Sequence, residues 1–173
     1  MRYIVLVSVV IINLIFSAAV FPNLNIADLA PDLIVCSMAS IVILEKRMTG
    51  AVIGFSAGLI LDLFLSGAIG FYALPYLLTG AVLYAAVRQI AFIDRILIPA
   101  AIAAGAYLLR ELISALLAYM LGHEFSLWHM LVRYILPEML ITAAVMIPVH
   151  LLLSRIYRSP SVRPQNPDEF KRL

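Results

Sequence analysis

Residues 48–65 read MTGAVIGFSAGLILDLFL, an apolar run that follows the charged triplet EKR at 45–47. At about 1.5 Å per residue this run forms a helix about 27 Å long, close to the ~30 Å hydrocarbon core of a bilayer. Residues 66–68, on its other flank, carry no charge. Basic residues on one flank alone predict a transmembrane helix that starts on the cytoplasmic side.

Similar apolar runs extend in both directions and predict an all-α protein with six transmembrane helices. The expected spans are 3–21, 33–44, 48–65, 69–87, 96–121 and 128–153. The second run is short, so we expect residues 27–32 to lengthen it, with Pro31 in a first turn that tolerates its missing N–H. Small residues at 17–19 leave cleavage of the first run as a signal peptide as an alternative.

The lysines and arginines outside these runs all fall on one side of the predicted zigzag. They are Arg2, Lys46, Arg47, Arg88, Arg95, Arg155, Arg158, Arg163, Lys171 and Arg172. Because flanking basic residues stay in the cytoplasm during insertion, we expect a multi-pass protein of the bacterial inner membrane with both termini cytoplasmic. Topology does not explain Arg110 and Arg133, which lie inside apolar runs.

The composition leaves little room for a soluble domain. The chain has 173 residues, of which 64% are hydrophobic and 13% are charged, and its mean hydropathy is +1.06, so lipid is the expected solvent. We expect one transmembrane domain over 1–153 and a disordered, basic, proline-rich cytoplasmic tail over 154–173, which can contact anionic lipid. The basic residues sit at membrane edges, so nucleic-acid binding is not predicted.

The sequence shows no recognisable catalytic or cofactor motif. Cys36 is the single cysteine, which excludes a disulfide and a cysteine zinc site. No metal motif surrounds His123, Glu124 and His129, and no Ser/His/Asp or Cys/His set has a recognisable context. We therefore predict that the protein has no metal or cofactor and is not an enzyme.

Glycines recur at every fourth residue in the 48–65 run. Gly50, Gly54 and Gly58 occupy these positions, and Asp62 takes the next one. A smooth glycine face is typical of close helix packing, so it is either an internal packing seam or a surface on which another helix docks. A carboxylate in hydrocarbon costs about 2.5–3.5 kcal/mol on insertion scales unless it is paired or wetted. Asp62 is therefore expected to have a partner.

Four more charged residues lie within the last two apolar runs: Arg110, Glu111, Arg133 and Glu138. Their depths, counted at about 1.5 Å per residue, allow Asp62 to pair with Arg133 and Glu138 with Arg110, although the reverse pairing is also possible. The pairs are either static ties between helices or the lining of a polar cavity or helix-docking site. Pro137, directly before Glu138, is either a kink that frees a carbonyl near this group or a tolerated membrane proline.

Three segments and one glycine together resemble the MreD family of rod-shape-determining membrane proteins. The segments are PDL at 31–33, GAVIGFSAGLILD at 50–62 and GFYAL at 70–74, and Gly80 follows. The resemblance covers the whole length, although its specificity rests on residues 31–80. The positions that match the family pattern are Asp32, Gly54, Gly58, Asp62 and Gly70.

The resemblance implies a fold distantly similar to the S components of energy-coupling-factor vitamin transporters. It also implies a non-enzymatic scaffold of the bacterial cell-elongation machinery that binds MreC, works beside MreB, RodZ, RodA and the RodA-associated transpeptidase, and helps to direct lateral peptidoglycan synthesis. A homo-oligomer is compatible with this role. The alternative is a vitamin-binding subunit of such a transporter, with its pocket near Asp62 and Arg133.

Overall fold

The computed structural model describes residues 2–15, 30–65, 70–90, 97–122 and 130–157, and all of their regular secondary structure is helical. The elements are α1 (Arg2–Ile15), α2 (Leu33–Glu45), α3 (Thr49–Leu65), α4 (Ala73–Gln89), α5 (Leu97–Met120), the π-helical turn η3 (Leu131–Ile135) and α7 (Leu136–Tyr157). The all-α prediction is therefore confirmed for these ranges. Residues 17–19 and the expected tail from 158 onward lie outside them.

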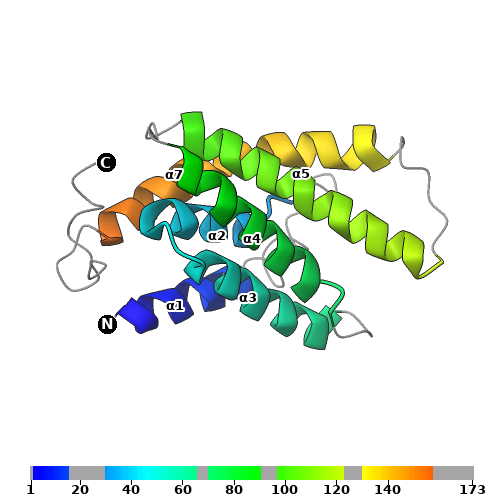
Figure 1. Cartoon of the computed structure of the whole chain (residues 1–173), viewed down its shortest axis with the longest axis horizontal. Helices are drawn as coiled ribbons and strands as arrows, with labels where there is room; N and C mark the ends of the chain where they lie inside the picture. The colour runs from blue at the N-terminus through cyan, green and yellow to red at the C-terminus, as the bar shows by residue number, and fades with distance from the viewer. Residues whose placement is uncertain (1, 16–29, 66–69, 91–96, 123–129, 158–173) are drawn as a thin grey trace.

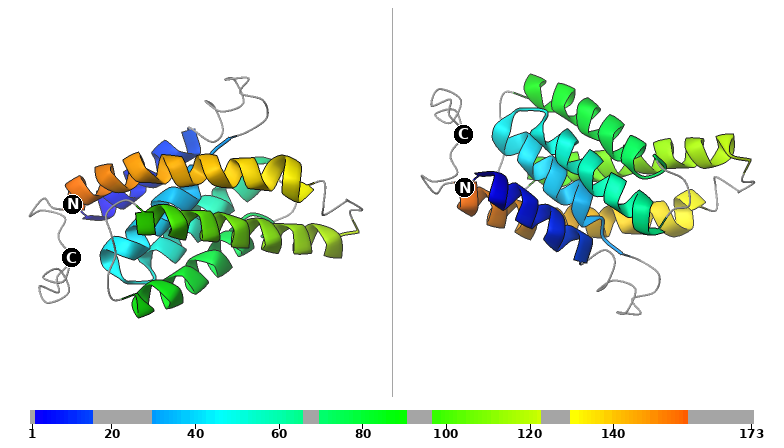
Figure 2. Two further views of the ribbon diagram at one scale, coloured as in Figure 1. Left: turned by 90° about the horizontal axis from the view of Figure 1, so that it is seen from above. Right: turned by 90° about the horizontal axis from the view of Figure 1, so that it is seen from below.

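Consecutive helices run in opposite directions along the long axis of the molecule (Figures 1 and 2). The start of α1 and the ends of α2, α4 and α7 all lie at one end of the bundle. Lys46 follows α2, and Arg88 lies in the last turn of α4. The fold therefore gathers these basic residues at one end, as the sequence predicted.

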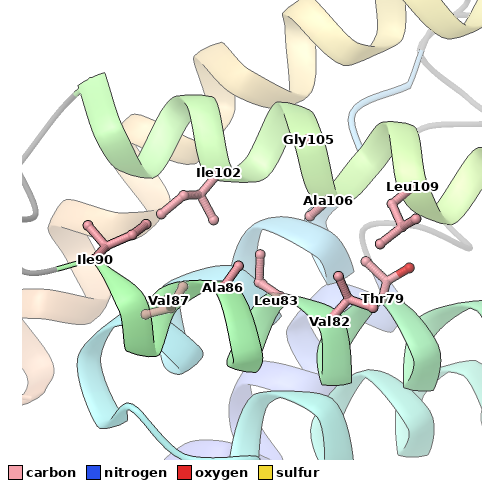
Figure 3. A pocket seen from close by; sticks show the side chains of 10 residues that line it. All are labelled: Thr79, Val82, Leu83, Ala86, Val87, Ile90, Ile102, Gly105, Ala106 and Leu109. Carbon is pink, nitrogen blue, oxygen red and sulfur yellow. The ribbon is translucent and has the colours of Figure 1, made fainter.

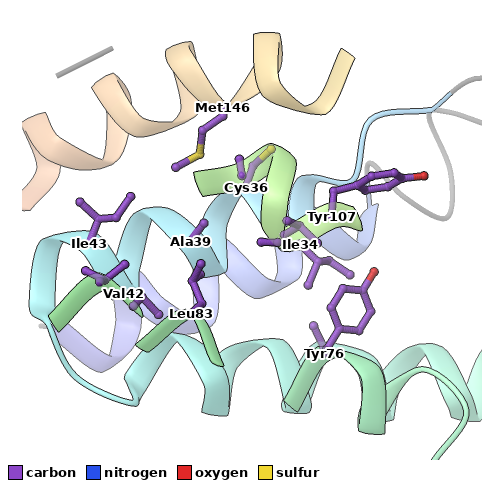
Figure 4. Close-up of a cluster of buried hydrophobic side chains, with 14 of the residues drawn as sticks. Ile34, Cys36, Ala39, Val42, Ile43, Tyr76, Leu83, Tyr107 and Met146 are labelled. Carbon is purple, nitrogen blue, oxygen red and sulfur yellow. The ribbon is translucent and has the colours of Figure 1, made fainter. Parts of the chain in front are cut away.

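Helix α2 is short and forms the centre of the bundle. It contacts each of the other five α-helices described, and every residue from Ile34 to Ile43 is buried. A helix that is apolar on every side is suited to such a position. Figure 4 shows its side chains meeting Leu83 of α4, Tyr107 of α5 and Met146 of α7.

The expected lengthening of α2 toward residue 27 is wrong. Asp32 caps the helix in an extended conformation (φ −82°, ψ 93°), and its side chain accepts a hydrogen bond from the N–H of Val35. Pro31 consequently lies before the helix and not in its first turn. A capping aspartate satisfies an N–H that would otherwise have no partner, so the helix begins here.

Two helical stretches are long and apolar enough to cross a membrane, namely α5 and the continuous stretch Leu131–Tyr157. In each, only 22% of the most apolar window is buried inside the molecule. Large apolar side chains such as Leu97, Leu116 and Leu152 are instead exposed. An exposed apolar surface of this kind fits a lipid environment better than the core of a soluble protein.

The glycines of α3 form a packing seam inside the chain. A Cβ at Gly54 would lie 2.5 Å from Met38 Sδ on α2, and one at Gly58 would lie 2.7 Å from Ala73 Cα on α4. Gly50 likewise abuts Val42 and the Met38 carbonyl. Because helices of this chain already cover the three glycines, they offer no surface to a partner helix.

A π-helical turn precedes Pro137. The proline ring collides with the carbonyl four residues earlier in a regular α-helix, and here that residue is Arg133. In η3 the N–H of Leu136 bonds instead to the carbonyl of Leu131, five residues earlier, which widens the turn. The irregularity expected at Pro137 is therefore a π turn that leads into α7.

Helix α7 extends to Tyr157, four residues past the expected end at 153. Tyr157 is 1% exposed, and its hydroxyl donates a 2.8 Å hydrogen bond to Glu45 Oε1 at the end of α2. Ile41, Ile53 and Leu153 surround it in a second apolar cluster. Burial of this aromatic ring explains why residues assigned to the tail continue the helix.

Candidate functional site

Buried and half-buried polar side chains from four segments meet beside the first turn of α2. We call this group the polar cluster: Asp32, Tyr76, Tyr107, Arg110, Glu111, Glu138 and Thr142. It contains four of the predicted site residues, Asp32, Arg110, Glu111 and Glu138. Two tyrosines and a threonine complete it, and these the sequence did not single out.

Asp32 joins the start of α2 to α4 and α7. Its Oδ1 caps α2 at the N–H of Val35, 2.9 Å away. Its Oδ2 accepts a 2.9 Å hydrogen bond from the Tyr76 hydroxyl of α4, and its backbone N–H donates to Thr142 Oγ1 of α7 at 3.2 Å. One residue outside the helices thus holds three of them.

Arg110 supplies the positive charge of the polar cluster. Its Nε lies 3.3 Å from Asp32 Oδ2, and its Nη2 pairs with Glu111. The guanidinium also lies over two aromatic rings, 5.4 Å from the centroid of Tyr76 and 5.3 Å from that of Tyr107. The rings stabilise the cation by cation–π attraction, which is stronger where water is excluded.

The predicted pair between Glu138 and Arg110 is wrong. In the described part of the chain, Arg110 pairs with Asp32 and Glu111, while Glu138 accepts a hydrogen bond from the Tyr107 hydroxyl of α5. The polar cluster therefore combines three carboxyl groups with one guanidinium. Its hydrogen bonds link α2, α4, α5 and α7, so it ties these helices together beside the start of α2.

The predicted pair between Asp62 and Arg133 is also wrong. Asp62 is 1% exposed, and its carboxylate accepts hydrogen bonds from the backbone N–H groups of Gly70 (2.8 Å), Tyr72 (2.7 Å) and Ala73 (3.1 Å). These donors open helix α4, where the helix dipole also favours a negative charge. Gly70 adopts φ +104°, a backbone conformation that favours glycine.

Arg133 lies on η3 and is exposed, without an ion pair in the described part of the chain. The Asp62 carboxylate accepts hydrogen bonds from the backbone at the start of α4, whereas the Arg133 side chain is exposed. These two residues therefore do not frame a small-molecule pocket. The transporter-subunit alternative placed its pocket there, and no observation favours it. His123, Glu124 and His129 lie outside the described residues.

A second set of polar contacts lies along α2, away from the polar cluster. Ser40 Oγ lies 2.9 Å from His150 Nδ1 of α7, and Asn13 Nδ2 of α1 donates to Ser37 Oγ at 2.6 Å. Both contacts are buried. Interhelical hydrogen bonds of this kind hold membrane helices together where apolar packing gives little specificity.

The tyrosines of the polar cluster had a signal in the sequence. Tyr76 and Tyr107 fall well inside apolar runs, whereas membrane tyrosines favour the interfaces. A buried hydroxyl needs a hydrogen-bond partner, so a mid-span tyrosine points to a polar neighbour. Thr142 carries no such signal, because a threonine commonly bonds within its own helix.

The family model of the rod shape-determining protein MreD matches residues 1–159. The chain belongs to the MreD family. The match spans every described helix, including the whole polar cluster. The chain matches no curated protein and no solved structure.

MreD is a family of membrane proteins with a role in determining rod shape. The positions of this chain that resemble the family pattern have structural explanations. Asp32 caps α2, Asp62 and Gly70 build the start of α4, and Gly54 and Gly58 let α3 approach its neighbours. The motif therefore specifies the MreD fold, and none of these contacts is catalytic chemistry.

Proposed function

We propose that this MreD-family protein is a six-span scaffold of the bacterial inner membrane that binds MreC and helps to direct lateral peptidoglycan synthesis. The observation that carries the proposal is the separation of polar and apolar surface. The polar cluster is turned inward and bonded across four segments, while large apolar side chains cover the outside of α5 and α7. Such a body is suited to hold partner helices.

The proposed topology places both termini in the cytoplasm. It is supported by the alternating directions of consecutive helices (Figure 1) and by Lys46 and Arg88 at a common end of the bundle. Basic flanks determine orientation during insertion. Asp32 and the polar cluster lie at the other end of α2 from Lys46, and they are therefore farther toward the outer side of the membrane.

A scaffold must hold its own helices in fixed positions in order to transmit position between partners. The polar cluster and the contacts of Glu45 with Tyr157 connect opposite ends of the central helix α2 to its neighbours. MreB, RodZ, RodA and the transpeptidase belong to the wider complex in this proposal. Self-association of the chain is part of the same proposal.

Two measurements in a rod-shaped bacterium that carries this protein test the proposal. Depletion of the protein is expected to give rounded cells, and MreC is expected to co-purify with the tagged chain after gentle detergent extraction. Cells that keep their rod shape during depletion would contradict the shape role. Purification without MreC would contradict the scaffold role as stated here.

A further inference from the structure

An apolar groove runs between α4 and α5. It encloses about 220 Å³ (Figure 3). The lining residues are Thr79, Val82, Leu83, Ala86, Val87 and Ile90 of α4, and Ile102, Gly105, Ala106 and Leu109 of α5. Val82, Ala86 and Gly105 are exposed, so the groove is accessible from outside the bundle.

Thr79 places a polar atom in this apolar lining. The side chain is fully buried, with 0% exposure, yet its Oγ1 has no hydrogen-bond partner among the described residues. A buried hydroxyl without a partner is unfavourable by about 1–3 kcal/mol, and lipid tails cannot supply one. A molecule that enters the groove with a polar group can supply the missing partner.

Gly105 on the opposite wall gives an independent indication. It lies in the interior of α5, where glycine is less favourable than alanine by about 1 kcal/mol. Its backbone needs no positive φ, and a Cβ added there would meet nothing within 4 Å. No described residue lies close enough to explain the glycine, whereas close approach by an outside helix does.

Three possible occupants differ in what they offer Thr79. A water molecule needs two to four polar partners, and the groove lining offers only Thr79 among otherwise apolar side chains. A lipid acyl chain has no hydrogen-bonding group. A transmembrane helix with a serine, threonine, asparagine or glutamine at this depth supplies both the apolar packing and the hydrogen bond.

The geometry points to the α4–α5 groove as the docking site for a partner's transmembrane helix that hydrogen-bonds to Thr79 through a polar side chain and packs against Gly105. This inference rests on the proposed binding of MreC, whose membrane anchor is the helix assigned to the groove. It adds the surface and the contacts to that proposal. A second copy of this chain is the competing occupant.

Photo-crosslinking in cells tests which molecule lies in the groove. The crosslinking amino acid p-benzoylphenylalanine replaces Val82, on the groove, or Val52, on α3; the two valines are 53% and 58% exposed. We expect a crosslink to MreC from position 82 and none from position 52. A crosslink from 82 to a second copy of the chain, or equal crosslinking from both positions, overturns the inference.

A matched pair of α4 substitutions tests whether the groove is needed for binding. Ala85 and Ala86 are both exposed, but only Ala86 lines the groove. Ala86→Leu fills the groove and is expected to lower MreC recovery about tenfold, the effect of about 1.4 kcal/mol. Ala85→Leu is expected to leave recovery unchanged, and equal recovery from both variants overturns the inference.

Thr79→Val separates docking from a structural role because the two predict opposite effects on the isolated protein. Valine keeps the shape and removes the partnerless hydroxyl, so the purified variant should melt at the same or a higher temperature, while MreC recovery falls about threefold. A lower melting temperature with unchanged recovery overturns the inference. If the wild-type chain does not recover MreC, the proposed function itself is contradicted. That outcome differs from failure of the groove inference, in which the wild-type chain recovers MreC and the variants recover it equally well.

Discussion

Asp62 shows how backbone N–H groups accommodate a carboxylate among apolar helices. In the described part of the chain, three backbone N–H groups at the start of α4 donate hydrogen bonds to it. Those N–H groups have no partner within their own helix, so the carboxylate and the helix start satisfy one another. This reciprocity makes the side chain part of the α3–α4 connection.

We expect Asp62→Asn to destabilise the protein by about 1–3 kcal/mol, because the amide offers one acceptor oxygen and turns its NH₂ toward backbone donors. Thermal unfolding in detergent, followed by circular dichroism, measures the effect. Ser56→Ala on α3 is the control, because Ser56 is exposed and bonds only the Val52 carbonyl of its own helix. An Asp62→Asn variant as stable as Ser56→Ala would contradict this assignment.

In the polar cluster, Arg110 is the residue whose substitution we expect to affect stability most directly. Both the charge and the planar shape of its guanidinium contribute to stability. Arg110→Met leaves Asp32 and Glu111 without their cation, and removal of one partner of a buried pair costs about 3–5 kcal/mol. Arg110→Lys keeps the charge but loses the planar contact with Tyr76 and Tyr107. We therefore expect melting temperatures in the order wild type, Lys, Met, measured in one detergent.

A double variant provides the control for that series. Asp32→Asn in the Arg110→Met background removes one of the two carboxylates left without a cation. The loss of stability in the double variant should be smaller than the sum of the two single losses. Additive losses would mean that the 3.3 Å contact between Arg110 and Asp32 contributes no coupling.

At the level of the helices, the sequence predicted positions well and partners poorly. The expected span 48–65 and the observed α3, Thr49–Leu65, nearly coincide, because hydropathy and flanking charge are local properties. The described donors to Asp62 lie eight to eleven residues away along the chain and are backbone N–H groups, which no side-chain pattern reveals. Likewise, α2 begins at Leu33 because Asp32 caps it, whereas the sequence predicted a longer helix.

The polar cluster could be predicted only in part for a similar reason. Arg110, Glu111 and Glu138 stood out because charge inside an apolar run is costly. Their pairing depends on the rotation of α5 and α7 about their axes, and counting depth along a helix leaves that angle undetermined. In the structure, Glu138 accepts a hydrogen bond from Tyr107 and not from Arg110, and Arg133 on η3 is exposed.

Two glycines, one on α3 and one on α5, should respond in opposite ways to an added methyl group. Gly58→Ala places a Cβ 2.7 Å from Ala73 Cα, and backbone cannot move aside without displacing the start of α4. Gly105→Ala meets nothing within 4 Å and gains about 1 kcal/mol of helix propensity. We expect Gly58→Ala to lower the melting temperature and Gly105→Ala to leave it equal or higher.

At the scale of the whole molecule, orientation is the property on which the scaffold proposal depends. Ala30, before the start of α2, and Gln89, in the last turn of α4, are both exposed, and α2 and α4 end on the same side of the bundle (Figure 1). Neither carries charge, so a cysteine at either position leaves the basic residues that direct insertion intact. The native Cys36 is 0% exposed and should contribute little background labelling.

We expect Ala30→Cys to react with a membrane-impermeant maleimide when the reagent can reach the outer face of the inner membrane. Gln89→Cys should react only after permeabilisation, because the end that carries Lys46 and Arg88 faces the cytoplasm. The reverse pattern would invert the protein and place the polar cluster on the cytoplasmic side. In the proposed topology, α2, α3 and α4 each cross the membrane between the two positions, so the two cysteines must lie on opposite sides. Labelling of both cysteines before permeabilisation would therefore contradict three crossings by α2, α3 and α4.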